Sequence, residues 1–483
     1  WTLRLKITKA MPTKQRIQTL HPLFCWHGFR YFETEGPCEV LCAEVIHTDV
    51  AVTSSFSCSD PVLNWLYEAY IRTQLDNYHG CIPSDCPHRE RLGYTGDGQL
   101  TEETAMLLLD TKELYRKWYQ DILDSQGAET GHIPHTAPFL GGGGGPGGWG
   151  CAVYQVPLAW AKIYGDDSLL VQGYDAILRW FDYMDAHSEK GLVVREEEGG
   201  WCLGDWCFPA SEEKEQLPEA FINTFYYLHG LQEMMQISEK MNNKLPIRFA
   251  EREKNVKNAF LDAYFDPETG DFCEGRAAGN AYGLALGLGD ERTKKHLVEK
   301  YEALERFDTG IFGTSMLLEQ LFSIGAGDLA VRLLTNDSEA ASFAHMKRNG
   351  ATTLWERWDG RESHNHPMFG ACVRLLFTQI LGIRMMPAAQ PPVVIPTQPD
   401  VTTQPTQALK PLNGELQPPA VPASAQHFSY EIRLSSQRQL TWAKGSIQTP
   451  DGILSVSWEL LENGEKQVEW SLAPAGEDKV PTM

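Results

Sequence analysis

The feature that most constrains the fold of this chain is a helical hydrophobic period that begins near residue 60 and persists to about residue 385. Asp60 is a favourable N-cap residue, and Pro61 suits the first helical position. Val62, Leu66 and Ala69 then recur at helical spacing. A stretch of this length holds roughly twelve helix-plus-loop units of ordinary size. That is the number that six helical hairpins need to close into a toroid.

Further apolar faces at helical spacing support the same prediction. Asp110 and Glu113 have the spacing of a capping pair ahead of one of these faces. The faces comprise Leu114, Trp118 and Ile122; Leu170, Tyr174, Leu178 and Phe181; and the ranges 225–237 and 256–264. We therefore expect residues 56–385 to form an (α/α)6 barrel.

The N-terminal residues 1–55 show the two-residue period of β-strands instead. Strands are predicted at 3–7, 29–32 and 40–46, with turn residues between them. We interpret the segment as the end of a leading β-sandwich domain. Because the alternation is present from the first residues, we expect the native N-terminus and any export signal to lie outside this sequence. The cellular location of the protein therefore stays open.

The C-terminal part of the chain is predicted to return to β structure. Residues 386–425 are rich in Pro, Thr and Gln, which indicates a linker or an extended loop. Leu454, Val456 and Trp458 then alternate with more polar neighbours as in a strand, and turns are predicted at 450–452 and 463–464. Residues 426–483 are therefore predicted to be a C-terminal β-sandwich. The fold class expected overall is mainly α, a barrel with β-sandwich segments at both ends.

Charge and composition exclude several classes of partner. The formal net charge is −22 and the isoelectric point about 5.1, a field that repels nucleic acid. No apolar run approaches the length that crosses a bilayer, so we expect no membrane association. The eleven cysteines are odd in number and irregularly spaced, which favours free buried thiols over a disulfide framework. The oligomeric state stays open.

The densest group of ionisable side chains lies in residues 84–97, which read S-D-C-P-H-R-E-R-L-G-Y-T-G-D. Pro87 and Gly93 prevent a continuous helix, so this segment is predicted to be a loop between two helical segments. A loop of this composition is either a surface segment laced with salt bridges or a polar site held by a rigid scaffold.

A second unusual segment places Glu356 between two tryptophans, Trp355 and Trp358. Aromatic rings offer stacking faces to sugars, and an apolar wall can raise the pKa of a nearby acid. The alternative is that both tryptophans are core residues at helical spacing and that Glu356 points to water.

Together the two segments resemble those of glycoside hydrolase family 78, the α-L-rhamnosidases. The resemblance runs in order over most of the chain. It comprises H-G-F-R-Y (27–31), F-S-C-S (56–59), the run 84–97, G-D-W (204–206), A-T-T-L-W-E-R-W-D (351–359), N-H-P-M-F-G (365–370) and A-K-G-S (443–446). It implies an (α/α)6 barrel and an inverting, exo-acting hydrolase of terminal α-L-rhamnose in glycans or glycosides, without a metal or an organic cofactor.

The same resemblance implies roles for individual residues. Glu90 would be the general acid, and Glu356 would be the general base. Sugar hydroxyls would be bound, or Glu90 tuned, by Asp85, Arg89 and Asp97. The pocket would also be lined by Tyr94, Trp149, Asp205, Trp206, Trp355 and His366.

Two departures from the family pattern leave the sugar open. Tyr94 stands where many relatives carry Trp, and Cys151 follows Trp149-Gly150 where many carry Asp. The alternatives are therefore a polysaccharide lyase that cleaves a rhamnose–glucuronate linkage on the same scaffold, and a non-catalytic sugar-binding relative. The glycine-rich run 141–148 lacks the Lys-Ser/Thr of a phosphate loop and is predicted to lie near the pocket rim.

A cluster of potential metal ligands precedes and enters the first motif. It consists of His79, Cys81, Cys86 and His88. Zinc would be held by such side chains, but their spacing fits no common zinc motif. We therefore expect no metal site here.

Overall fold

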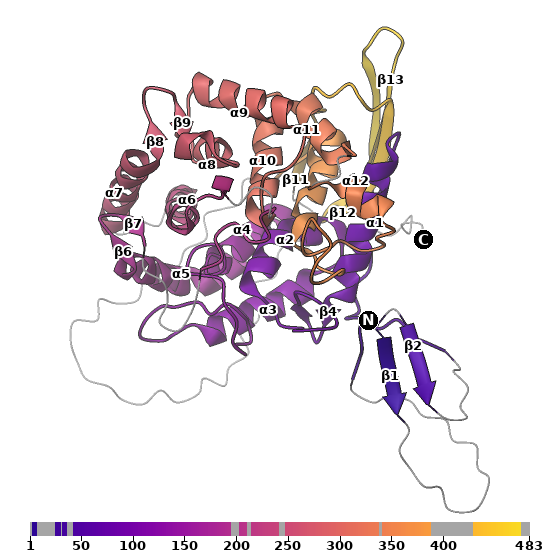
Figure 1. The fold of residues 1–483 in the computed structure, drawn as a ribbon, viewed down its shortest axis with the longest axis horizontal. Helices are drawn as coiled ribbons and strands as arrows, with labels where there is room; N and C mark the ends of the chain where they lie inside the picture. Colours follow the sequence, from indigo (N-terminus) through magenta and orange to yellow (C-terminus); the bar gives the residue numbers. More distant parts are fainter. Residues whose placement is uncertain are drawn as a thin grey trace, which may run out of the picture.

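The computed structural model describes residues 2–6, 25–29, 31–35, 42–194, 202–209, 214–240, 247–337, 341–387 and 428–474. These residues are mainly helical, with short hairpins between helices and a sheet near the C-terminus (Figure 1). The helices are α1 (Pro61–Asp76), α2 (Thr95–Leu108), α3 (Lys112–Ser125), α4 (Ala152–Tyr164), α5 (Ser168–Ala186), α6 (Glu219–Lys240), α7 (Ile247–Tyr264), η2 (Cys273–Gly275), α8 (Gly279–Ala285), α9 (Glu291–Leu304), α10 (Ile311–Ser323), α11 (Gly327–Thr335), α12 (Phe343–Arg348), η3 (Met368–Val373) and η4 (Leu376–Ile380). The strands are β1 (Thr2–Lys6), β2 (Tyr31–Glu35), β3 (Ser54–Cys58), β4 (Tyr78–His79), β5 (Ile82–Pro83), β6 (Ser188–Glu189), β7 (Leu192–Val193), β8 (Phe265–Asp266), β9 (Asp271–Phe272), β10 (Ile383–Pro387), β11 (Phe428–Ile432), β12 (Trp442–Thr449), β13 (Gly452–Leu460) and β14 (Lys466–Ala473).

Helix α1 begins where the sequence predicts. The Asp60 carboxylate accepts hydrogen bonds from the backbone N–H groups of Val62 (2.7 Å) and Leu63 (3.2 Å). These bonds satisfy two N–H groups that have no partner within the helix. The predicted N-cap is confirmed.

Helix α3 begins differently from the prediction. Its N-cap is Thr111, which makes no side-chain cap bond, and the Asp110 backbone N–H donates to Ala51 O at 2.9 Å. The expected capping pair of Asp110 and Glu113 is therefore wrong, because a contact with the preceding segment fixes the start of the helix. The predicted apolar face of α3 is buried, as expected.

Most helices pack against the next helix along the chain or the next but one. Helix α2 contacts α4, α4 contacts α5, α6 contacts α7, and α8 contacts both α9 and α10. In Figure 1, α7 and α9 lie at the periphery, while α6 and α8 lie next to them toward the centre. Segment η3 contacts α2 as well as α10, so the last helical part of the chain lies against one of the first.

Large aromatic side chains fill the interior, and one of them fixes the start of α2. Trp118 of α3 is fully buried, and its Nε1–H donates to Ala137 O at 3.0 Å. Its ring lies against Gly98 of α2, where an added Cβ would stand 2.1 Å from a ring carbon. Glycine at this position therefore lets α2 and α3 approach closely.

A four-stranded antiparallel sheet, in the order β14-β13-β12-β3, joins distant parts of the chain. In β13, buried Leu454, Val456 and Trp458 alternate with more exposed neighbours, which confirms the predicted period. The two predicted turns are confirmed as well, because they connect β12 to β13 and β13 to β14. Trp458 Nε1–H donates to Ile380 O at 2.8 Å and so attaches this sheet to the helical part.

The predicted ends of the chain are described in part. Strands β1 and β2 pair in parallel, close to the first two predicted strands. The third, at 40–46, is wrong over its described residues, because residues 42–48 form no strand. Instead, Thr48 N–H donates to Tyr78 O at 2.6 Å, which ties this segment to β4. Strand β10 pairs with β11, and most of the predicted linker lies outside the described residues.

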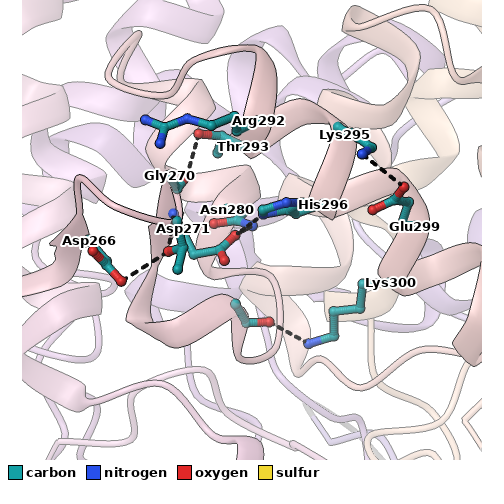
Figure 2. Close-up of polar contacts among 12 residues, drawn as sticks. Asp266, Gly270, Asp271, Asn280, Arg292, Thr293, Lys295, His296, Glu299 and Lys300 are labelled. Carbon is teal, nitrogen blue, oxygen red and sulfur yellow. Dashed lines mark hydrogen bonds and ion pairs between the residues drawn. The ribbon is translucent and has the colours of Figure 1, made fainter.

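A polar network fastens the β8–β9 hairpin to α8 and α9 (Figure 2). Asp271 Oδ1 accepts from Asn280 Nδ2 at 2.8 Å and lies 3.0 Å from His296 Nδ1. The Asn280 side-chain oxygen in turn accepts from the Phe272 backbone N–H at 2.7 Å. Thr293 Oγ1–H donates to Gly270 O at 2.6 Å.

Replacing Asn280 by Ala is expected to lower the free energy of unfolding by about 1–3 kcal/mol. The physical reason is that the buried N–H of Phe272 loses its acceptor. Urea titration followed by circular dichroism measures the change. The control is Lys295→Ala, which removes an exposed ion pair with Glu299 at 3.6 Å. It should cost under about 0.5 kcal/mol, and an equal loss in both variants contradicts the assignment.

Candidate active site

Residues 84–94, here called the Glu90 loop, lead from the β4–β5 hairpin into α2. Asp85 closes this loop on itself. Its backbone N–H donates to Leu92 O at 3.1 Å, and its carboxylate accepts from the Leu92 N–H at 2.9 Å. Burial raises the pKa of Asp85 to about 6, although the nearby His366 acts in the opposite direction. Asp85 is 2% exposed and serves first to shape the loop.

One arginine of the loop joins the two glutamates singled out by the sequence. Arg89 Nε lies 3.3 Å from Glu90 Oε1, and Arg89 Nη2 donates to Glu356 Oε2 at 2.9 Å. A third bond runs from Arg89 Nη1 to Glu362 Oε2 at 2.7 Å. A guanidinium is a small planar group, and this one contacts both carboxylates. Glu90 and Glu356 are therefore close together in space. They are 266 positions apart in the sequence.

The two glutamates differ in their surroundings. The Glu90 side chain is 39% exposed, whereas the Glu356 side chain is 5% exposed. Glu356 Oε2 also accepts from the Ser363 backbone N–H at 3.0 Å, while its own N–H donates to Ser363 O at 2.8 Å. One carboxylate is therefore held rigidly inside the protein, and the other lies at its surface.

A buried histidine connects Glu356 to the start of α2. His366 Nε2 lies 2.9 Å from Asp97 Oδ1, and His366 Nδ1 lies 3.6 Å from Glu356 Oε2. Burial opposes the charged imidazolium, but the hydrogen bond to Asp97 and the carboxylate charges outweigh it and raise the pKa of His366 to about 9. His366 is therefore a cation at neutral pH. Burial raises the pKa of Asp97, against the effect of His366.

Tyr94 lies beside Glu90, and a glycine-rich segment lies beside Tyr94. Tyr94 is half-buried, and burial, followed by its interaction with Glu90, raises the pKa of the phenol. A Cβ added to Gly142 would stand 2.8 Å from the Tyr94 ring. Trp149 is 2% exposed and lies between Gly96 and Gly144, whose added Cβ atoms would meet its ring within 2.5 Å. The glycine-rich run thus packs on two predicted site residues.

The structure gives Asp205 a different environment from the one expected of a sugar ligand. Asp205 is fully buried, and its carboxylate accepts from the backbone N–H groups of Gly310 (2.8 Å), Phe312 (2.9 Å) and Gly313 (3.0 Å). These are the first N–H groups of α10. Burial raises the pKa of Asp205 to about 6 in spite of these bonds. Its oxygens are engaged by the helix.

The predicted tryptophans are placed around the same segments. Trp206 follows Asp205, and its ring lies 5.8 Å from the Arg357 guanidinium carbon. Trp355 is 6% exposed and stacks on His364 with ring centroids 4.7 Å apart. Trp358 belongs to the core, since its ring stacks on Phe307 and its Nε1–H donates to Thr309 O at 2.9 Å. The core interpretation is therefore right for both tryptophans, while Glu356 is buried and does not point to water.

Two residues in direct contact with this cluster were missed from the sequence. Glu362 bonds to Arg89, and the backbone of Ser363 pairs with Glu356. Both lie in the turn that follows the second motif. Their only sequence signal was their position between the W-E-R-W run and His366, which is too weak to assign a role.

The cysteines and the histidines of the potential metal cluster lie in surroundings different from those of a metal site or a disulfide framework. All ten cysteines within the described part of the chain are free thiols. His79 stacks on Trp26, with ring centroids 3.8 Å apart. Cys151 is fully buried, and its Sγ–H donates to Gly148 O at 3.4 Å. Within the described ranges, no group of three or more His, Cys, Asp or Glu side chains is placed to hold a metal ion, and no helix is long and apolar enough to cross a membrane.

The helical part of the chain and the loops that carry Glu90 and Glu356 fall within one known domain family. Residues 51–380 match the family model of the bacterial alpha-L-rhamnosidase six-hairpin glycosidase domain. The chain belongs to this family, as the resemblance of its motifs predicted.

Curated relatives carry the same family name. The chain is 29% identical over 410 residues to an alpha-L-rhamnosidase of Streptomyces avermitilis, covering 79% of this chain and 38% of that protein. It is 26% identical over 489 residues to an alpha-L-rhamnosidase of an Alteromonas species, covering 94% of this chain and 48% of that protein. The chain therefore spans less than half the length of these relatives.

Solved structures show the same fold. The Streptomyces avermitilis alpha-L-rhamnosidase, solved with L-rhamnose, matches with a TM-score of 0.71 at 24% identity, covering 86% of this chain and 37% of that chain. The alpha-L-rhamnosidase of Aspergillus terreus matches with a TM-score of 0.74 at 22% identity, covering 89% and 48%.

Proposed function

We propose that this chain is the catalytic part of an inverting exo-α-L-rhamnosidase, which hydrolyses terminal α-L-rhamnose from glycans or glycosides. The observation that carries the proposal is that Arg89 contacts both Glu90 and Glu356, which differ strongly in exposure. An inverting glycosidase needs two carboxyl groups roughly 6.5–9.5 Å apart, with a water between one of them and the sugar. The names of the relatives support rhamnose as the sugar.

In this mechanism the two glutamates take opposite roles. Glu90, as the general acid, gives its proton to the glycosidic oxygen while the bond from that oxygen to the anomeric carbon breaks. Glu356, as the general base, takes a proton from a water whose oxygen attacks the anomeric carbon from the other face. The products are free rhamnose of inverted configuration and the leaving alcohol, and the two carboxyl groups have exchanged protonation states.

The charges around Glu356 suit its role as the general base. Arg89 and the His366 imidazolium lie against Glu356, and both attract the anionic form that a base requires. Tyr94 interacts with Glu90 and would help to orient it. Asp85, Arg89 and Asp97 would orient the sugar and the two glutamates.

The helical part would be a closed (α/α)6 barrel with this site at one end. The contacts of η3 with both α2 and α10 support closure, because they join the end of the helical chain to its beginning. The residues assigned here complete acid–base hydrolysis with water alone, so the mechanism calls for no cofactor.

The direct test is incubation of the protein with methyl α-L-rhamnoside while proton NMR follows the anomeric signals. The expected first product is β-L-rhamnose, which then mutarotates. Early release of α-L-rhamnose refutes inversion, and absence of any release refutes the proposed activity. An unsaturated uronate absorbing in the ultraviolet, formed from a rhamnose–glucuronate oligosaccharide, would instead establish a lyase.

The charge on His366 predicts a specific dependence of stability on pH. Since the pKa of His366 rises from 6.5 to about 9 on folding, its ion pairs stabilise the fold fully below pH 6.5. That contribution, on the order of 3 kcal/mol, is lost as the pH rises through 9. The measurement is urea unfolding of the parent and His366→Gln from pH 6 to pH 10. The difference between them should shrink over this range, and a constant difference contradicts a charged His366.

A further inference from the structure

An exposed apolar tip, formed by residues 138–140, projects from the segment between α3 and α4. Phe139 is 58% exposed and Leu140 is 74% exposed, and Pro138 before them is exposed as well. Single exposed apolar side chains are ordinary, but three in succession are unusual for a loop tip. This tip offers no side-chain hydrogen-bonding group to water or to a ligand.

The base of this tip is bonded to the end of the Glu90 loop. Ala137 N–H donates to Gly93 O at 2.9 Å, and Thr95 N–H donates to His135 O at 2.8 Å. The backbones of Tyr94 and Thr136 form an antiparallel bridge between these two bonds. The approach is so close that a Cβ added to Gly93 would stand 2.5 Å from Ala137 O. The tip is therefore fixed relative to the loop that carries Glu90.

The tip is also fixed internally by the glycine-rich run. Thr136 Oγ1–H donates to Gly141 O at 2.8 Å, and Leu140 N–H donates to Thr136 Oγ1 at 3.0 Å. His135 Nδ1 lies 3.1 Å from Gly142 O. Gly142 in turn lies against the ring of Tyr94, which interacts with Glu90. A single tyrosine thus separates the start of this rigid turn from the proposed general acid.

We propose that the tip is the binding surface for the leaving group and that it selects rhamnosides with a planar aromatic aglycone. This inference rests on the proposed function. A general acid must touch the oxygen that carries the leaving group, so the leaving group lies on the Glu90 side of the site. A surface of Phe and Leu gains most by covering a flat apolar ring, whereas a second sugar stacked on it would find no side-chain partner for its hydroxyls.

The test compares the parent with Phe139→Ser/Leu140→Ser on three substrates: 2-naphthyl α-L-rhamnoside, methyl α-L-rhamnoside and a rhamnosyl-glucose disaccharide. The value of kcat/KM for the naphthyl substrate should fall about tenfold. Its values for the other two should stay within about twofold. The control is Leu461→Ser, which removes an exposed apolar side chain in the β13–β14 turn and should change none of the three.

Two results overturn the proposal. Equal losses on the naphthyl and methyl substrates would show that the tip acts on the rhamnose site, and a larger loss on the disaccharide would assign it to a sugar leaving group. Calorimetric binding of the naphthyl substrate separates this proposal from the proposed function. If the parent hydrolyses no rhamnoside but the double variant binds the naphthyl substrate more weakly, the proposed role of the tip stands and the proposed hydrolase activity is refuted. Unchanged binding refutes the tip.

Discussion

Replacing Glu356 by Gln is expected to lower kcat on methyl α-L-rhamnoside by about 10²–10⁴-fold. The amide keeps the shape of the side chain but cannot accept a proton from water. Glu90→Gln should lower kcat on the same substrate by a similar factor, because the departing methoxide needs a proton. Steady-state assays of released rhamnose measure both effects.

The leaving group separates the two roles. With an aryl rhamnoside whose phenol is acidic, the loss in Glu90→Gln should shrink, since that leaving group departs without full protonation. The loss in Glu356→Gln should persist. Glu362→Gln is the matched control, because Glu362 also bonds to Arg89 but is 52% exposed. Its activity should stay within a few-fold of the parent. Near-normal activity of either main variant removes that residue from its role.

Replacing Asp205 by Ala is expected to lower the free energy of unfolding by about 3–5 kcal/mol. The change leaves three backbone N–H groups at the start of α10 buried without an acceptor. Chemical denaturation measures the loss, and KM on any substrate that the folded fraction turns over should change little.

Two further variants sharpen this test. Asp205→Asn keeps one acceptor oxygen and should lose less stability than Asp205→Ala. Asp290→Ala removes an exposed N-cap of α9, where solvent can replace the lost bonds, and should cost about 1 kcal/mol. If the Asp205→Ala protein were as stable as the parent but had a strongly raised KM, Asp205 would have to be a sugar-binding residue instead.

The structural predictions that were confirmed depend on local sequence patterns. The N-cap at Asp60 and the alternation in β13 each depend on residues within one turn or one strand, so short-range rules suffice. The role of the Asp205 carboxylate depends on backbone N–H groups of a helix 105 residues further along the chain, and no sequence-spacing rule relates residues so far apart. The predicted cap at Asp110 was wrong for the same reason, because the Asp110 backbone N–H donates to Ala51 O, a residue far away in the sequence.

In the candidate site, too, the sequence singled out individual residues but not the contacts between them. The resemblance singled out Glu90 and Glu356 because each lies in a specific motif. The bond network between them could not be foreseen, because it requires Arg89 to span two segments that meet only in the folded protein. Trp355 and Trp358 carry near-identical sequence signals, and both are buried in the core. Their ring partners nevertheless differ, His364 for the first and Phe307 for the second. Tertiary packing alone distinguishes them.

The sheet in which β3 pairs with β12 has a consequence for any attempt to isolate the helical part. Strand β3 directly precedes α1, and its only strand partner in the described sheet comes from residues 442–449. A fragment ending near residue 385 would expose both the edge of β3 and the backbone acceptor of Trp458. Strand β3 and the C-terminal strands therefore hold the two ends of the helical part together, and a stable expression fragment has to contain both.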